Sequence, residues 1–140
     1  MAGNAVIITT GTVMLNGADF SDQVFEARIV RTRETVEVPA VFSTGRKEQR
    51  AGAVSNELQL HFYNDHALST LWALTWDQID DADGEVSFEC RFMPGVASAT
   101  NPKFTGTVVI TSGSAGGASG SLSENTVTFP IKGAITKVIV

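Results

Sequence analysis

Hydrophobic and polar residues alternate with a period of two over several separate segments of this chain. In "ELQLHFY" (57–63) the even positions are apolar and most odd positions are polar, and "EVSFECRF" (85–92) and "TVTFPIK" (126–132) repeat the pattern. Such alternation is typical of antiparallel strands that bury one face and expose the other. "NPKFTGTVVITS" (101–112) and "AITKVIV" (134–140) are also rich in strand-forming residues. "NAVIITTGTVML" (4–15) is expected to be an opening strand that ends at the turn Asn16–Gly17.

The longest candidate strand, residues 24–38, changes its apolar phase along its length. Phe25, Ala27 and Ile29 occupy odd positions, whereas Val36 and Val38 occupy even ones. A change of phase within one strand indicates a β-bulge or a strong bend. The alternative is that the segment forms two strands.

One segment, "NDHALSTLWALTW" (64–76), has helical spacing. We expect a helix from about Asp65 to about Trp76, capped by Asn64 or Asp65. Its apolar stripe would cover one face of the sheet and would consist of Leu68, Leu71, Trp72 and Trp76. A chain of 140 residues is expected to form a single domain over residues 1–140. The predicted fold class is therefore mainly β: an antiparallel β-sandwich or partial barrel with one flanking α-helix.

Two segments show neither the two-residue period of a strand nor the spacing of a helix. They are expected to be long loops, at about residues 39–56 and 111–125. The first carries the charged run "RKEQR", and the second reads "TSGSAGGASGS" over residues 111–121. Loops of this length in small domains are usually functional or disordered. A surface insertion without function is the alternative, because added loop residues cost little entropy. The presence of two such loops, one of them basic, favours contact with a partner.

The composition limits the classes of partner. Charged residues make up 18% of the chain, below the usual share of about 25%, so either partners cover part of the surface or the chain is a well-packed monomer with a Ser- and Thr-rich surface. The net charge of −5 argues against general nucleic-acid binding, which needs excess Lys and Arg. The sequence shows no signal peptide and no membrane-spanning run. We expect a protein made in a cytoplasm, with no membrane partner.

No motif for catalysis, metal binding or cofactor binding is recognisable. Cys90 is the single cysteine and shares the apolar face of its strand, so we expect a small buried hydrophobic residue. The acidic run "DQIDDADGE" fails as a calcium-binding loop, because aligning Gly84 with the loop glycine puts Ile79 at the first ligand position. No G-x-S-x-G, P-loop or dinucleotide motif is present. We therefore expect no enzyme activity and no cofactor.

The C-terminal third, "SATNPKFTGTVVITSGSAGGASGSLSENTVTFPIKGAITKV", resembles the major tail (tail tube) proteins of long-tailed bacteriophages. The shared pattern is a strand that begins Asn-Pro-x-Phe/Tyr-x-Gly, a Gly/Ser-rich loop, an "NTVTFPIKG"-like strand and a closing strand. Upstream, "TGRKEQRAGAVSNELQLHFYND" is similar to the same group. The resemblance covers about Thr44 to Lys137 and consists of residue types rather than a catalytic signature.

The resemblance implies a structural virion protein of the phage tail, assembled in the host cytoplasm. Its copies would form hexameric rings that stack into a hollow tube. Strands from each subunit would join into one barrel around the channel through which DNA is ejected without specific binding. Other tail proteins, such as the tape measure and the terminator, would be partners. Independently, unpaired sheet edges are a liability that closing a ring of copies would remove.

Two sets of residues are candidate sites of assembly. Basic residues of the first loop would contact an acidic patch on a neighbouring subunit or ring; the set is Arg46, Lys47, Arg50, Asp80, Asp81 and Asp83. Polar residues of the long strands would line a channel that repels DNA phosphate; the candidates are Glu26, Glu34, Glu57, Gln59, Glu85 and Glu89. The Gly/Ser loop would become ordered between stacked rings, or it would be an exposed tip on the outer surface of the tube.

Two other classes of protein fit parts of the sequence. A capsid decoration or cement protein is also β-rich and without chemistry, but it would form no tubes. A small ligand-binding β-sandwich would need an exposed aromatic platform, whereas Trp72 and Trp76 fit the buried stripe of the expected helix better.

Overall fold

Seven β-strands and one short helix are present in the computed structural model, which describes residues 8, 10–40, 42 and 45–139. The elements are β1 (Thr12–Leu15), β2 (Ala18–Asp19), β3 (Val24–Val38), β4 (Glu48–Tyr63), α1 (Leu71–Gln78), β5 (Glu85–Arg91), β6 (Lys103–Val109) and β7 (Glu124–Val138).

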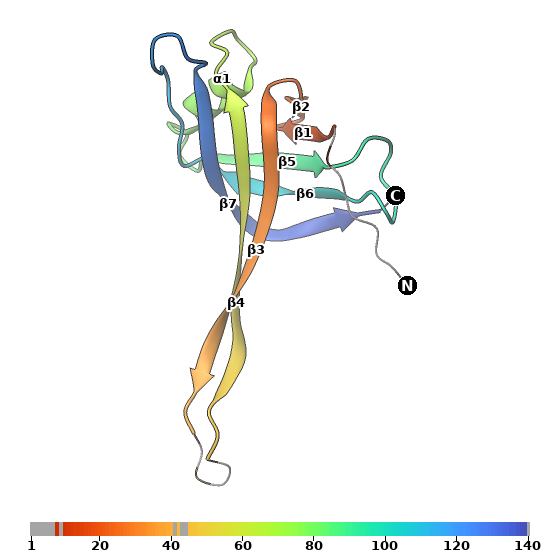
Figure 1. Ribbon diagram of the computed structural model, residues 1–140, viewed down its shortest axis with the longest axis vertical. Helices are drawn as coiled ribbons and strands as arrows, with labels where there is room; N and C mark the ends of the chain where they lie inside the picture. The colour runs from red at the N-terminus through yellow and green to blue at the C-terminus, as the bar shows by residue number, and fades with distance from the viewer. Residues whose placement is uncertain (1–7, 9, 41, 43–44, 140) are drawn as a thin grey trace.

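The strands form one antiparallel sheet in the order β2-β1-β5-β6-β7-β4-β3, folded into two layers. In Figure 1, β3, β4 and the first half of β7 run along the length of the molecule. We call this layer the upright sheet. The second layer crosses it and contains β2, β1, β5, β6 and the second half of β7; we call it the transverse sheet. The expected fold class, mainly β with antiparallel strands and one helix, is confirmed.

Strand β7 belongs to both layers. Its first half, up to Pro130, pairs with β4, and its second half, from Ile131, pairs with β6. Gly133 lies within the second half at a φ of 75°, a conformation that residues with a Cβ rarely adopt. The β6–β7 register shifts at this point, between the Thr105 and Thr107 pairs. Residues 126–132 and 134–138, expected to belong to two strands, therefore form part of one bent strand, which ends at Val138, and residue 140 lies outside the described part of the chain.

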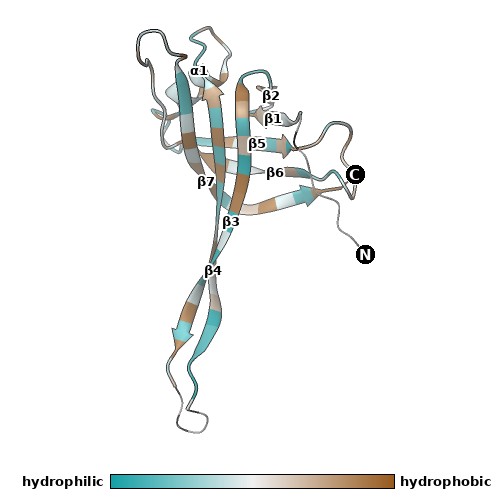
Figure 2. Ribbon diagram, in the orientation of Figure 1, coloured by the Kyte–Doolittle hydropathy of each residue, from teal (hydrophilic) through white to brown (hydrophobic). Residues whose placement is uncertain are grey.

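The core lies between the inner faces of the two sheets. The predicted alternation is confirmed in β4, β5 and β7: Figure 2 shows hydrophobic and hydrophilic residues taking turns along these strands. α1 adds Leu71, which is fully buried in the same cluster. The largest fully buried side chains come from β1, β4, α1 and β7, and they are Phe62, Phe129, Leu15, Leu58, Leu60 and Leu71.

The turn at Asn16–Gly17 is confirmed as the connection between β1 and β2. Both residues have positive φ, 53° and 80°, and Leu15 pairs with Ala18 across the turn. Two consecutive positive φ angles are typical of the type I′ turn, for which Asn-Gly is the preferred sequence. Of the expected opening strand, the structure forms β1 from Thr12 onward, and residues 4–7 and 9 lie outside the described part of the chain.

The helix begins later than expected, at Leu71 rather than near Asp65. Asp65 caps a local turn, because its carboxylate accepts a hydrogen bond from Ala67 N at 3.0 Å. Thr70 is the true N-cap, and its side chain accepts from Ala73 N. Because the helix starts at Leu71, Leu68 lies outside it and is 92% exposed. The predicted apolar stripe is therefore wrong at Leu68.

The predicted irregularity in β3 is confirmed, and the strand is continuous. The β3–β4 register shifts twice, between Val24 and Glu26 and between Arg33 and Thr35. The first shift leaves Phe25 without a pairing partner on β4 and turns its side chain outward, where it is 54% exposed. Ala27 and Ile29 then face the core.

The prediction of a long loop over residues 39–56 is wrong, because β4 begins at Glu48 and residues 48–56 pair with β3. The two strands leave the body together as a two-stranded ribbon, which projects at the lower end of Figure 1. We call this ribbon, residues 31–56, the arm. The second loop, expected over about residues 111–125, is present over residues 110–123, and its last two expected residues begin β7.

Truncating the inner face of β4 should destabilise the fold. Leu58 is fully buried, and replacing it with Ala is expected to lower the free energy of unfolding by about 2–5 kcal/mol, because the change leaves a cavity. Leu122→Ala, on the exposed Gly/Ser loop, is the control and should change it by less than about 0.5 kcal/mol. Urea unfolding of both variants measures the difference. A loss below 1 kcal/mol for Leu58→Ala would contradict the assignment of this face.

Candidate assembly surfaces

The outer face of the upright sheet brings three of the six channel candidates together. Cross-strand neighbours share a face, and the register places Glu26 beside His61, and Arg28 beside Gln59. Val30 pairs with Glu57 in the next outward row. Glu26, Gln59 and Glu57 therefore lie on one surface, completed on β7 by Thr126 and Thr128.

This polar face carries partly compensated charge. Arg28 Nη2 lies 3.4 Å from Glu26 Oε1, and both side chains are more than half exposed. An exposed pair of this kind contributes little to stability, but it reduces the negative field of the surface. Glu57 and Glu124 add further carboxylates to the same face.

The other three channel candidates lie elsewhere. Glu85 and Glu89 are on the outer face of the transverse sheet, where each meets a lysine: Glu85 meets Lys132, and Glu89 lies 3.3 Å from Lys103. Glu34 is on the arm, at the second register shift of β3. A channel bordered by one sheet face can include the three candidates of the upright sheet, or Glu85 and Glu89 of the transverse sheet, but not both groups. The six candidates therefore lie on three different surfaces, and their role as a channel lining stays a prediction.

Two strand edges of the upright sheet are open. Among the described residues, no strand pairs with the second side of β3 or with the second side of β7 over Glu124 to Pro130. Pro130 lacks a backbone N–H, which suits an edge. Such edges present unpaired backbone groups that can pair with a strand of another chain.

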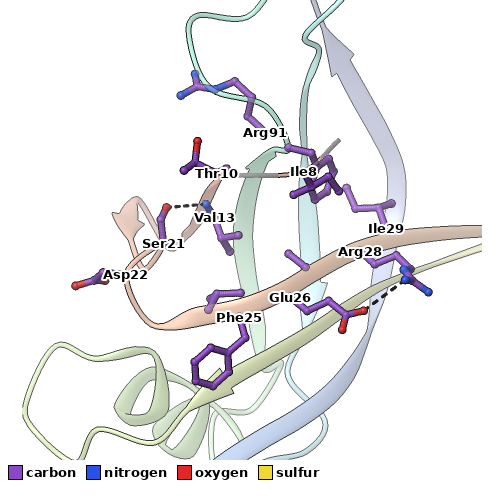
Figure 3. Close-up of a pocket in the computed structure, with 14 residues that line it drawn as sticks. Ile8, Thr10, Val13, Ser21, Asp22, Phe25, Glu26, Arg28, Ile29 and Arg91 are labelled. Atoms are coloured by element: carbon purple, nitrogen blue, oxygen red, sulfur yellow. Dashed lines mark hydrogen bonds and ion pairs between the residues drawn. The ribbon is translucent and has the colours of Figure 1, made fainter. Parts of the chain in front are cut away.

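A cleft of about 850 Å³ follows the open edge of β3. It is lined by the chain leading into β1 and by residues 24–29 of β3, and Figure 3 shows Ile8 and Ile29 among the side chains that line it. Arg91 lies on the rim and donates a hydrogen bond to Thr12 Oγ1 at 3.1 Å. Ala27 and Ile29 are only half-buried here, so this side of the core is incompletely covered.

The arm carries the basic candidates. Arg46 and Lys47 lie in the connection at its end, and Arg50 lies in β4 close to that end. Lys47 Nζ lies 3.5 Å from Glu37, and Arg50 Nη2 lies 3.5 Å from Glu48. Residues 31–56 hold five of the ten basic residues but only three of the fifteen acidic ones. The arm is therefore positive, and the remainder of the chain is strongly negative.

The acidic candidates occupy the turn between α1 and β5, at the other end of the molecule from the arm (Figure 1). Asp80, Asp81 and Asp83 are exposed. The Asp81 carboxylate accepts a hydrogen bond from Asp83 N at 3.2 Å, and this bond is the main cause that lowers the pKa of Asp81. The Asp81 carboxylate therefore stays ionised to a lower pH than an ordinary aspartate. Within one subunit the basic and acidic sets are far apart, so any contact between them would join different copies.

The Gly/Ser loop is anchored at its base. Asn125, 2% exposed, donates to Ser114 O at 3.2 Å and to Asn64 Oδ1 at 2.5 Å. Asn64 in turn donates to Ser123 Oγ at 2.8 Å. Residues 115–122 between these anchors are exposed. The loop is held in place within a single subunit, which leaves only its tip available for later ordering.

Sequence reasoning missed an aromatic stack on α1. The rings of His66 and Trp72 are 4.2 Å apart at 29°, and those of Trp72 and Trp76 are 5.4 Å apart at 24°. Trp76 is 47% exposed, so its assignment to a buried stripe is wrong. Thr75, buried to 1% exposure, takes the inward position instead. Thr70 is a sequence signal for the later helix start, but Asp65 is an equally good cap.

The described residues offer no group of three or more His, Cys, Asp or Glu side chains that could hold a metal ion. Within the same residues, no helix is long and apolar enough to cross a membrane. Cys90 is buried as expected, and burial raises the pKa of its thiol to about 12.

The fold is similar to those of two chains from large particles. One belongs to the "Virion of native gene transfer agent (GTA) particle", with a TM-score of 0.70, 17% identity and coverage of 92% of this chain and 95% of that chain. The other belongs to the "anti-feeding prophage (AFP) baseplate, 6-fold symmetrised", with a TM-score of 0.61, 15% identity and coverage of 99% and 97%. No family model and no curated protein matches the sequence.

The Cys90 thiol should be unreactive in the folded protein. At pH 8 a thiol-specific reagent is expected to modify it only after denaturation, because the folded thiol is buried and its pKa is raised. In the unfolded chain the thiol ionises from about pH 9, so between about pH 9 and 12 this group should make the fold less stable as the pH rises. Rapid labelling of the native protein at pH 8 would contradict this burial.

Proposed function

We propose that this protein is a structural subunit of a phage-tail-type particle, and that its copies form hexameric rings stacked into a tail tube. Its role is assembly and not catalysis. The shared fold with chains of a gene transfer agent virion and of a six-fold symmetrised baseplate supports this class of protein. The sequence resemblance to tail tube proteins points in the same direction.

The observation that carries the proposal is the arm. A two-stranded ribbon is marginally stable in water by itself, and Arg31 to Glu37 on β3 are all exposed. Of the arm residues that the structure describes, only Asn56 at its base is buried, so packing within its own subunit does not explain the length of the arm. Its positive charge, set against the acidic turn at the far end of the body, favours contact between successive rings. In this arrangement Arg46, Lys47 and Arg50 face Asp80, Asp81 and Asp83.

Ring closure would use the open edges of the upright sheet. The β3 edge of one copy and the β7 edge of the next would pair, which satisfies the unpaired backbone groups on both. The neighbour would also cover the cleft along β3, where Ala27 and Ile29 are half-buried. The outer face of the upright sheet would then border the channel.

This channel would be polar and weakly negative. Glu26, Glu57 and Gln59 would line it, with Arg28 reducing its charge. Carboxylates repel phosphate, so DNA would pass without binding. Glu85 and Glu89, in the other layer, would face away from the channel.

Electron microscopy of the purified protein tests the proposal. Concentrated protein should form hollow rods with six subunits in each ring. Discrete particles that bind capsids would instead favour a decoration protein. Monomers at every concentration would refute the tube.

Reversing the charge of the arm should block stacking. Arg46, Lys47 and Arg50, all replaced by Glu, are expected to leave folded subunits that form no rods, because the arm would then repel the acidic turn. Reversing Lys103, Lys132 and Lys137 changes the net charge equally and serves as the control. Sedimentation and circular dichroism measure assembly and folding. Normal rods from the arm variant would remove the arm from the contact.

Charge reversal on the two sheets should distinguish residues that line the channel from residues that face away from it. Glu57→Lys is expected to slow DNA ejection from assembled particles, since it places a cation where DNA passes. Glu89→Lys makes the same change on the transverse sheet and should leave the ejection rate unaltered. A slowing caused by Glu89→Lys alone would mean that the other face lines the channel.

A further inference from the structure

The α1 end of the molecule exposes apolar side chains that its own fold does not use. Leu68 precedes the helix, Trp76 lies on it and Ile79 follows it, and all three are exposed. They lie at the end of the body opposite the arm (Figure 1). All three belong to one segment of twelve residues, and clustered exposed apolar residues are typical of interaction sites. We call these three residues the apolar patch.

The apolar patch has a rigid base. Trp76 stacks on Trp72, which stacks on His66. Trp72 Nε1 also donates a hydrogen bond to Ser114 O at 2.9 Å, which fixes its ring against the base of the Gly/Ser loop. Trp76 is therefore presented on a prearranged surface. Prearranged aromatic side chains lose little entropy on binding and are common binding hot spots.

The segment that carries the patch is acidic, and we call its carboxylates the acidic rim. Residues 64–84 contain no Lys or Arg, and their five carboxylates are Asp65, Asp77, Asp80, Asp81 and Asp83. An occupant of this surface should therefore combine an apolar contact with positive charge.

The arm has both properties. Phe42, near its end, is fully exposed, and Val36 and Val54 are exposed along its strands. Arg46 and Lys47 lie in the same connection as Phe42. The arm leads away from the α1 end of its own subunit (Figure 1), so it can reach this surface only on another copy.

We infer that the apolar patch is the docking surface for the arm of a second copy, with Phe42 packed on Trp76 and Ile79 inside the acidic rim. The inference rests on the proposed stacking and adds its apolar anchor. A contact between two different surfaces is heterologous, so each copy can bind one neighbour at each end. The charges would guide the approach, and the aromatic contact would set the rate of dissociation.

Crosslinking between introduced cysteines tests the pairing directly. The double variant Phe42→Cys/Ile79→Cys, treated with a short bis-maleimide, should give a ladder of covalent oligomers on denaturing gels. Phe42→Cys/Val96→Cys is the matched control, because Val96 is exposed on the β5–β6 connection, and it should give no ladder. The native Cys90 is buried and should not react.

Substituting the anchor provides a second measurement. Trp76→Ala should raise the protein concentration required for assembly about tenfold or more. Leu122→Ala, an exposed residue of the Gly/Ser loop, should leave it unchanged. Circular dichroism and urea unfolding verify that both variants fold.

The outcomes separate this inference from the proposed function. A ladder specific to Ile79→Cys supports the docking. Rods without that ladder, or an equal ladder from the Val96→Cys control, overturn the docking and leave the tube intact. A native protein that forms no rods at any concentration overturns both.

Discussion

The sharing of β7 between two layers is the constraint on which this structure depends. Because one strand pairs with β4 over its first half and with β6 over its second, the relative orientation of the two sheets is fixed by a single bent backbone. The inner faces then enclose Leu58, Phe62 and Phe129. The same arrangement ends the upright sheet after three strands and leaves both of its edges open. The bend that encloses this core therefore also leaves two strand edges unpaired among the described residues.

The arm and the body divide the charge of the chain between them. A protein of net charge −5 would normally repel its own copies, yet half of its basic residues are gathered on one projection. This separation makes a head-to-tail approach favourable and a head-to-head approach unfavourable. The exposed ion pairs along the arm, such as that of Lys47 with Glu37, contribute little to folding. They leave the arm positive, since it holds five basic residues and only three acidic ones.

The sequence predicted the body better than the assembly surfaces, and the reason is burial. Period two is visible in β4 from Leu58 to Phe62 because water lies on one side and the core on the other. The arm half of the same strand has solvent on both sides, so no apolar period marks it, and residues 48–56 read as a loop. The predicted start of the helix was wrong for a different reason. Asp65 and Thr70 are both good N-caps. Only tertiary contacts select Thr70, such as the hydrogen bond from Leu71 N to Gln23 Oε1.

The division of the channel candidates could not have been made from sequence either. Glu57 and Glu89 have the same local pattern, an acid on the polar face of an alternating strand. They differ only in the layer to which the strand belongs, which the bend in β7 decides.

The opposite character of the two ends has a consequence for any polymer built from this subunit. In a filament stacked as proposed, one terminus displays unoccupied cationic ribbons and the other displays unoccupied acidic, aromatic surfaces, so the filament is polar. Neither terminus contains a signal to stop growing, since every added ring recreates the surface it covers. Length must then be imposed by a separate component, and the proteins that close the two termini need opposite electrostatic character.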